Sequence, residues 1–352
     1  MARKILRPTR NPKAVATIID LIHGYASGVP ATTKIEKAIE RALTRVDSNR
    51  QIAQRMVKHF SEISSETKAE VFGTFVEGQL RGAPTVDLKV LFQPNVALFA
   101  DDVGLGDPPI YPTDTQFTVV YTGLYCNQRT GDRPIIGSSD EPYVITSGVF
   151  IEGGENKIQS EIHPVGDPDQ HYGDVDSGEF RVGPIAACWS GLAQEVSIVS
   201  VVMENDEGDP EAFREEIETA VAAAAAVALF FGYSVPESLQ DFAVDGLLWL
   251  IGSGDDEIGT DIAVLTAGKL RRLANTPTLK HQDKRTVVKF SGFFSDIPEV
   301  EEVIDQTNLD RHFITNHTSS GKYVVTYKVT ANKAPIGQGV FGRHHDHIVV
   351  SG

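Results

Sequence analysis

One stretch of the chain, residues 196–259, constrains the fold more than any other. It opens with the apolar run 196–203, which has the length of a buried strand, and continues directly into the acidic segment 204–209. An alanine-rich segment with helical character follows, and the stretch closes on acidic residues 255–257 before a second strand-like run. If the helical insert leaves and re-enters a sheet at one place, the two acidic segments must lie close together in space.

Beyond about residue 85 the sequence has the two-residue alternation of β-strands. Strand-like runs occur at 86–92, 117–126, 143–151, 185–189, 196–203, 262–265, 287–294 and 323–329. Several short strands separated by polar loops indicate an antiparallel β-sandwich. We therefore predict an α+β protein, with a β-sandwich over residues 85–352 that contains a helical insert at 210–252.

Residues 1–80 have the pattern of helices and predict an N-terminal helical module. Pro12 is well placed for a helix start, and Thr32 or Thr33 is positioned to cap a second helix that contains Glu36. Apolar residues then recur at three- and four-residue intervals as far as Val76. The module either packs on the main domain as a small bundle or binds a partner through one helix face.

The insert has the pattern of a helical hairpin. Pro210 marks its start, because proline is favoured at the first position of a helix. The run 220–231 is apolar on every helix face and must be covered, and a second apolar segment follows at 242–251. The hairpin packs on the sandwich or on the N-terminal helices, is buried between copies of the chain, or enters a membrane; the sequence leaves these alternatives open. For a membrane or partner contact, the expected residues are Val227, Phe230, Phe231 and Trp249.

Charge and cysteine content narrow the class of protein. The net charge of −16 argues against general binding to nucleic acid, whose phosphates the surface would repel, and it suits acidic clusters partly neutralised by cations. Cys126 and Cys188 are too few for a disulfide scaffold and lie in strand-like sequence, which predicts buried free thiols. We expect no signal peptide, and no apolar run reaches the roughly 18 to 20 residues that span a bilayer. The expected location is the cytoplasm, or outside the cell after export by another route.

Acidic residues gather in three predicted loops of the sandwich. Calcium takes roughly six to eight oxygen ligands, mostly carboxylates and carbonyls, and loops at one end of a sandwich supply them from several strand connections. The candidate ligands, loop by loop, are Asp132, Asp140 and Glu141, then Glu204 and Asp206, then Asp255 and Asp256. These residues predict a calcium site.

The same loops resemble those of the C2 domain, a β-sandwich that binds phospholipid membranes when calcium fills its loops. Residues 139–144, Ser-Asp-Glu-Pro-Tyr-Val, are similar to that family's Ser-Asp-Pro-Tyr-Val motif with one residue added. Residues 204–206 are similar to its Asp-x-Asp pair, and 256–259 fit its Asp-x-Ile-Gly motif. The resemblance covers about 115–266, and its third loop would contain the whole helical insert. It implies as calcium ligands Asp132, Asp140 or Glu141, Glu204, Asp206 and Asp256.

Three other segments are candidate sites. Residues 173–179 alternate carboxylates and glycines, as a further calcium loop would. Residues 163–171 hold two histidines and two aspartates that could form a metal or acid–base site, and His-His-Asp-His at 344–347 could bind a transition metal. We find no motif of a known enzyme class.

These observations favour a non-enzymatic calcium-binding protein whose target is membrane lipid or a protein partner. A second hypothesis is a membrane-active toxin or secreted effector whose apolar insert enters a bilayer. A third is an enzyme of unrecognised type. Calcium-dependent binding to vesicles without leakage would favour the first hypothesis, and leakage of vesicle contents would favour the second.

Overall fold

The computed structural model describes most of the predicted elements. The described residues are 12–44, 50–62, 64–66, 107–130, 139–165, 171–205, 209–231, 256–290, 298–318 and 321–336. The strand expected at 86–92 and the second helix of the expected hairpin lie outside them. The fold is α+β with mostly antiparallel sheets, as predicted.

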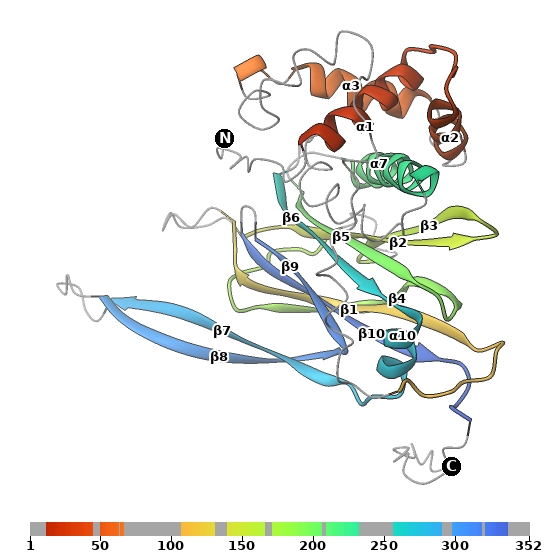
Figure 1. Ribbon diagram of the computed structural model, residues 1–352. Helices are drawn as coiled ribbons and strands as arrows, with labels where there is room; N and C mark the ends of the chain where they lie inside the picture. The colour runs from red at the N-terminus through yellow and green to blue at the C-terminus, as the bar shows by residue number, and fades with distance from the viewer. Residues whose placement is uncertain are drawn as a thin grey trace, which may run out of the picture.

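Two antiparallel four-stranded sheets form the centre of the molecule (Figure 1). The first sheet has the order β4 (Phe180–Leu192), β1 (Gln116–Gln128), β10 (Lys322–Ala331), β9 (Phe313–His317). The second has the order β3 (Glu155–His163), β2 (Pro142–Glu152), β5 (Val196–Glu204), β6 (Asp256–Leu265). The chain crosses from one of these sheets to the other between β1 and β2, between β3 and β4, and between β4 and β5, which ties the two sheets together.

The two sheets share one hydrophobic core. Tyr121 of β1 and Val325 of β10 cluster there with Ile198 of β5. Trp189 of β4 is fully buried in the same cluster, and Phe150 of β2 meets its ring edge to face at 6.1 Å. Burying side chains of this size stabilises the fold by roughly 1.5–3 kcal/mol each. The arrangement is compatible with the predicted β-sandwich.

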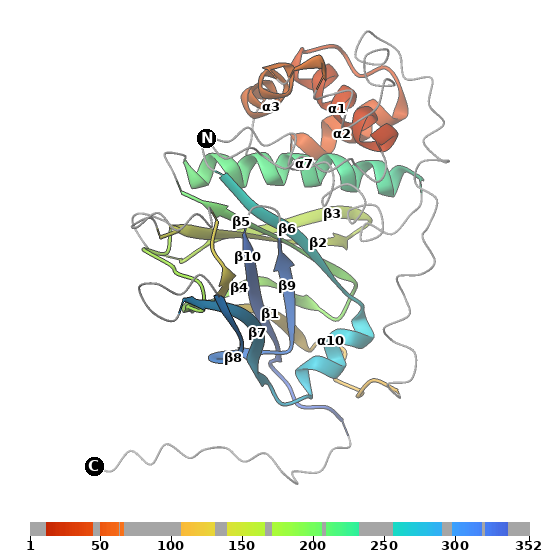
Figure 2. The ribbon, with the colours of Figure 1, turned by 90° about the vertical axis from the view of Figure 1, so that its left-hand side faces the viewer.

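Helix α7 (Pro210–Phe231) lies between β5 and β6 in sequence and begins at the predicted proline. Residues 220–226 of the helix are buried, because one side packs on the second sheet and the other on the N-terminal helices (Figure 2). A helix that is apolar on every face requires such cover. The side chains of Val227, Phe230 and Phe231, and the whole of Trp249, lie outside the described part of the structure.

The N-terminal helices are α1 (Pro12–Ala26), α2 (Lys34–Leu43) and α3 (Arg50–Glu62). Helix α2 begins with the expected capping box: the Thr33 hydroxyl accepts from the Glu36 N–H, and the Glu36 carboxylate accepts from the Thr33 N–H. Arg55 of α3 lies 3.4 Å from the buried Glu216 of α7. The N-terminal helices therefore pack on the described part of the insert, which is one of the alternatives that the sequence left open.

Among the described residues, a third sheet consists of β7 (Leu279–Phe290) and β8 (Pro298–Arg311) alone, and it extends past the two central sheets (Figure 1). Its base packs against the first sheet, where Leu309 contacts Tyr125 and Val324. Helix α10 (Ala267–Ala274) precedes it. Residues 269–284 form most of α10 and the start of β7.

Two further expectations concern the thiols and the membrane. Cys126 and Cys188 are buried free thiols, as predicted. Among the residues that the structure describes, no helix combines the length and apolar character needed to cross a bilayer.

Candidate functional site

Strand register brings the described residues of the three predicted acidic loops together at one end of the second sheet. Glu204, the last residue of β5, lies opposite Pro142 of β2 on one side and Asp256 of β6 on the other. The backbone N–H of Asn205 donates to the carbonyl of Glu141 at 3.1 Å. Asp140, Glu141, Glu204 and the backbone of Asp256 thus lie side by side. Asp132, Asp206 and Asp255 lie outside the described residues.

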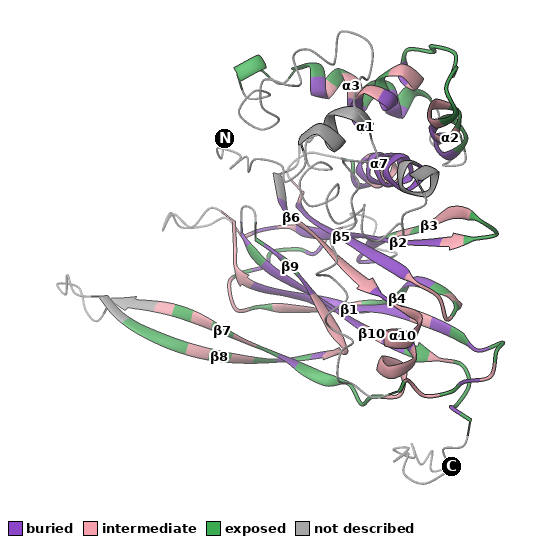
Figure 3. Cartoon of the chain, viewed as in Figure 1, coloured by how far each residue is buried: buried purple, intermediate pink, exposed green. Residues whose placement is uncertain are grey.

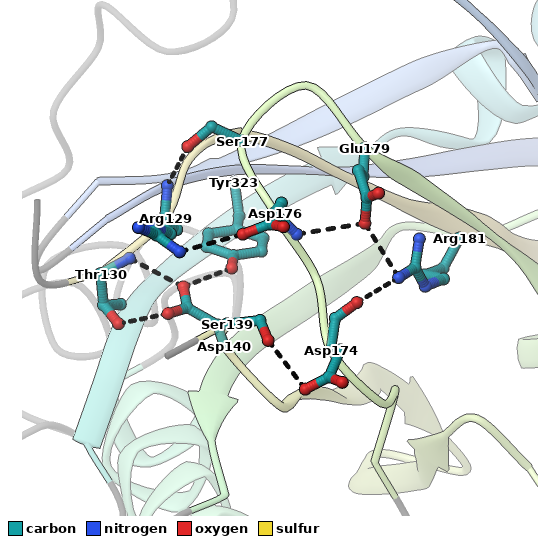
Figure 4. Close-up of polar contacts among 10 residues, drawn as sticks. All are labelled: Arg129, Thr130, Ser139, Asp140, Asp174, Asp176, Ser177, Glu179, Arg181 and Tyr323. Carbon is teal, nitrogen blue, oxygen red and sulfur yellow. Dashed lines mark hydrogen bonds and ion pairs between the residues drawn. The ribbon is translucent and has the colours of Figure 1, made fainter. Parts of the chain in front are cut away.

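Asp140 is the most enclosed acidic group at this end, with only 2% of its surface exposed. Its Oδ2 accepts hydrogen bonds from the Thr130 N–H at 2.7 Å and the Tyr323 hydroxyl at 2.5 Å (Figure 4). Burial, more than the nearby Cys126 or the bond to Asp140, raises the pKa of Tyr323 far above its ordinary value. Tyr323 therefore keeps its proton and acts as a donor, which fixes the Asp140 carboxylate in position.

The Thr130 hydroxyl contacts two carboxylates at once. Its Oγ1 lies 2.7 Å from Asp140 Oδ1 and 2.6 Å from Glu204 Oε2. A hydroxyl has one hydrogen, so it can donate to only one of these two oxygens. A bound cation or a second proton would stabilise the other close oxygen–oxygen contact. The three oxygens come from the end of β1, the segment before β2 and the end of β5.

The loop 173–179 lies beside this cluster. Asp140 and Val175 exchange both backbone hydrogen bonds, at 3.3 and 2.8 Å. The Ser139 hydroxyl donates to Asp174 Oδ1 at 2.7 Å (Figure 4). The loop is thereby held against the segment that carries Asp140.

Two arginines pair with two of the three carboxylates of the loop. Arg129 Nη1 lies 3.0 Å from Asp176 Oδ1, and Arg181 Nη2 lies 3.0 Å from Glu179 Oε2 (Figure 4). The backbone N–H of Asp176 contributes most to lowering the pKa of Glu179, and Arg181 lowers it further. The loop 173–179 therefore differs from the calcium loop that the sequence predicted, because carboxylates expected to bind calcium are paired with arginines.

The histidines of the segment 163–171 occupy different environments. His163 is fully buried, stacks on Tyr121 at 4.1 Å between ring centres, and hydrogen-bonds Thr146 at 3.0 Å. His171 Nε2 instead lies 3.9 Å from Glu141 Oε2, near the acidic end. The aspartates of that segment and the residues 344–347 lie outside the described residues.

Sequence reasoning missed two residues of the site, Thr130 and Tyr323. Tyr323 is 183 residues from Asp140 in the chain, and only the pairing of β10 with β1 brings the two together. Thr130 lies two residues after the end of β1, so a search for hydroxyls beside the acidic loops would have found it. In the described part of the chain, no three His, Cys, Asp or Glu side chains group closely enough to hold a metal ion. The cluster at Thr130 consists of two carboxylates and one hydroxyl.

Comparison with known proteins finds no matching family model, no matching curated protein and no matching solved structure. The likeness to the C2 domain therefore remains a resemblance carried by three motifs, at 139–144, 204–206 and 256–259.

Proposed function

We propose that this chain is a non-enzymatic binding protein, built on a C2-like β-sandwich, whose acidic end binds calcium. The observation that carries the proposal is the oxygen cluster of Thr130, Asp140 and Glu204, in which one hydrogen serves two carboxylate contacts. A cation bound by the three oxygens would remove the need for a second proton. Calcium suits the cluster because it binds oxygen ligands at about 2.3–2.6 Å with tolerant geometry.

The proposed ligand set extends this cluster with residues that neighbour it in sequence or register. Asp206 follows Glu204 by two residues, and Asp256 is the cross-strand neighbour of Glu204. Asp132 and Asp255 remain candidates from their loops. Between Asp140 and Glu141, the geometry favours Asp140, because the side chain of Glu141 is 46% exposed and lies beside His171.

The proposed target is the surface of an anionic membrane or an acidic partner protein. A chain with a net charge of −16 is repelled by such surfaces, and bound calcium would reduce that repulsion where the loops approach. Burial of residues 220–226 of α7 favours this function over the membrane-active toxin. Insertion of α7 would first require the loss of its contacts with both the second sheet and the N-terminal helices.

Thermal unfolding with and without calcium tests the proposed site. Calcium at about 100 times its dissociation constant should stabilise the native state by roughly 2.7 kcal/mol. Glu204→Gln and Asp256→Asn should each reduce this stabilisation, whereas Glu152→Gln, at the opposite end of the second sheet, should leave it unchanged. Equal stabilisation of all three variants, or none of the unmutated chain, would refute the site.

Vesicle binding tests the proposed target separately. Vesicles that contain phosphatidylserine should sediment with the protein in calcium and release it when a chelator is added, without leakage of a trapped dye. Dye release by the unmutated chain would instead support the membrane-active hypothesis. Calcium stabilisation without vesicle binding would point to a protein partner.

A further inference from the structure

In the described part of the structure, the β7–β8 hairpin is an arm whose outer half has no further strand paired to either edge. Within the described residues, each of its strands pairs only with the other. The base is anchored, because Tyr125 of the first sheet and Arg285 of β7 both contact the Asp305 carboxylate at 2.5 Å. The outer half, residues 286–290 and 298–302, extends beyond the central sheets, and its described side chains are mostly exposed (Figures 1 and 3). Unpaired edges of this kind are templates for pairing with another strand.

The arm also exposes apolar side chains that a partner would cover. Val300 is 66% exposed and Ile304 is 57% exposed, and both lie on the same face of β8. A two-stranded hairpin without further cover is only marginally stable in water. Addition of further strands would therefore stabilise the outer half of the arm.

Charge is separated between the two strands of the arm. Strand β7 carries four basic residues and one acidic residue, whereas β8 carries five acidic residues and one basic residue. Within one copy these charges pair across the hairpin, as in the 2.7 Å contact of Lys284 with Glu302. At the free edges, the same charges make β7 repel another β7 and attract a β8. If both strands carried charges of one sign, the charges would oppose every pairing of edges and would not favour β8 over β7 as the partner of β7.

We infer that the arm joins copies of this chain by β-strand addition, with the β7 edge of one copy against the β8 edge of the next. The partner is a second copy of this chain, because one molecule carries both the basic β7 edge and the acidic β8 edge. Each copy in such a head-to-tail contact keeps one edge free, so the assembly continues past the dimer until it closes into a ring or grows as a filament. The inference does not depend on the calcium site.

Sedimentation velocity of the full chain over a range of concentrations tests the inference. We expect species larger than a dimer at low salt, and a lower apparent association constant at high salt because screening weakens the attraction between the edges. A single monomeric species at every concentration in low salt would overturn the inference.

Charge reversal identifies the edges that pair. In the outer half of the arm, the variant Glu301→Lys/Glu302→Lys leaves β8 with two basic residues and one acidic residue, and the variant Lys284→Glu/Lys289→Glu replaces the basic Lys289 of β7 and the nearby Lys284 with acidic residues. Each variant alone should lose more than about tenfold in apparent association constant, because every edge then meets one of like charge. Mixed in equal amounts, the two variants should assemble again, since the edges of one complement those of the other. Failure of the mixture to assemble would contradict edge pairing.

The control changes the charge by the same amount elsewhere. Glu40→Lys/Glu152→Lys alters two exposed carboxylates away from the arm and should assemble like the unmutated chain. Circular dichroism and thermal unfolding of all variants establish that each is folded before sedimentation. Loss of assembly in this control to the same extent as in the arm variants would attribute association to net charge and overturn the role of the arm.

Discussion

At the scale of single residues, Asp140 is the side chain on which the acidic end depends. It is buried, accepts hydrogen bonds from the Thr130 N–H and the Tyr323 hydroxyl, and lies 2.7 Å from the Thr130 hydroxyl. We expect Asp140→Asn to destabilise the chain by roughly 1–3 kcal/mol even without calcium, because an amide presents a donor where the site offers donors. Denaturant unfolding in chelator measures this. Asp174→Asn, which alters a neighbouring carboxylate bonded only to Ser139 among the contacts described above, should change the stability by less than about 0.5 kcal/mol.

Two interior histidines predict a pH dependence of stability. Burial lowers the pKa of His163 to about 3 and that of His317 to about 4. Because the unfolded chain protonates histidine below about pH 6.5, stability is full above that pH and falls as the pH drops towards these native values. Each histidine should contribute roughly 1.4 kcal/mol per pH unit to the loss between about pH 6 and 4.5.

Unfolding in urea between pH 7.5 and 4.5 measures this dependence. His317→Asn should give a shallower decline than the unmutated chain, whatever its stability at neutral pH. His59→Gln on the surface of α3 should retain the full decline. An identical slope in the His317 variant would show that protonation of this residue does not limit acid stability.

At the scale of elements, α7 is the helix against which both the second sheet and the N-terminal helices pack. Ala224 is fully buried between the second sheet and the N-terminal helices. We expect Ala224→Asp to cost more than about 3 kcal/mol, since it buries a carboxylate without a partner in a site sized for a methyl group. Ala212→Asp provides the control, because this half-exposed position lies in the first turn, where the helix dipole favours an acidic residue.

Limited proteolysis gives a second measurement on the same helix. If α7 holds the N-terminal helices in place, Ala224→Asp should increase cleavage between residues 12 and 62, and Ala212→Asp should not. Unchanged cleavage in a clearly destabilised variant would mean that the N-terminal helices do not depend on α7.

At the scale of the whole molecule, the sequence predicted the buried elements, because burial produces a recognisable pattern of apolar residues. Strands β1, β2, β5 and β10 are apolar because they lie between layers, and each coincides with a predicted run. Strand β8 was missed because it lies in the exposed arm, where charged residues replace the apolar alternation. Strand β3 was missed for a similar reason, since much of this edge strand is polar and partly exposed.

At the site, contacts that depend on motifs local in sequence could be predicted, and contacts that depend on the pairing of distant strands could not. The convergence of Asp140, Glu141, Glu204 and Asp256 followed from strand-to-loop motifs that are local in sequence. The role of Tyr323 did not, because it depends on the pairing of the first and last strands of the first sheet. The hydrogen bond from Tyr323 to Asp140 depends on such pairing and has no signature in the sequence around Asp140.

Calorimetric titration of calcium into the chelator-treated full chain tests the central claim most directly. The account predicts saturable heat in the unmutated chain, and a much weaker signal in Glu204→Gln and in Thr130→Val, which lacks the shared hydroxyl, but not in Thr130→Ser. Injections that give only the heat of dilution, in a chain that remains folded, would contradict it.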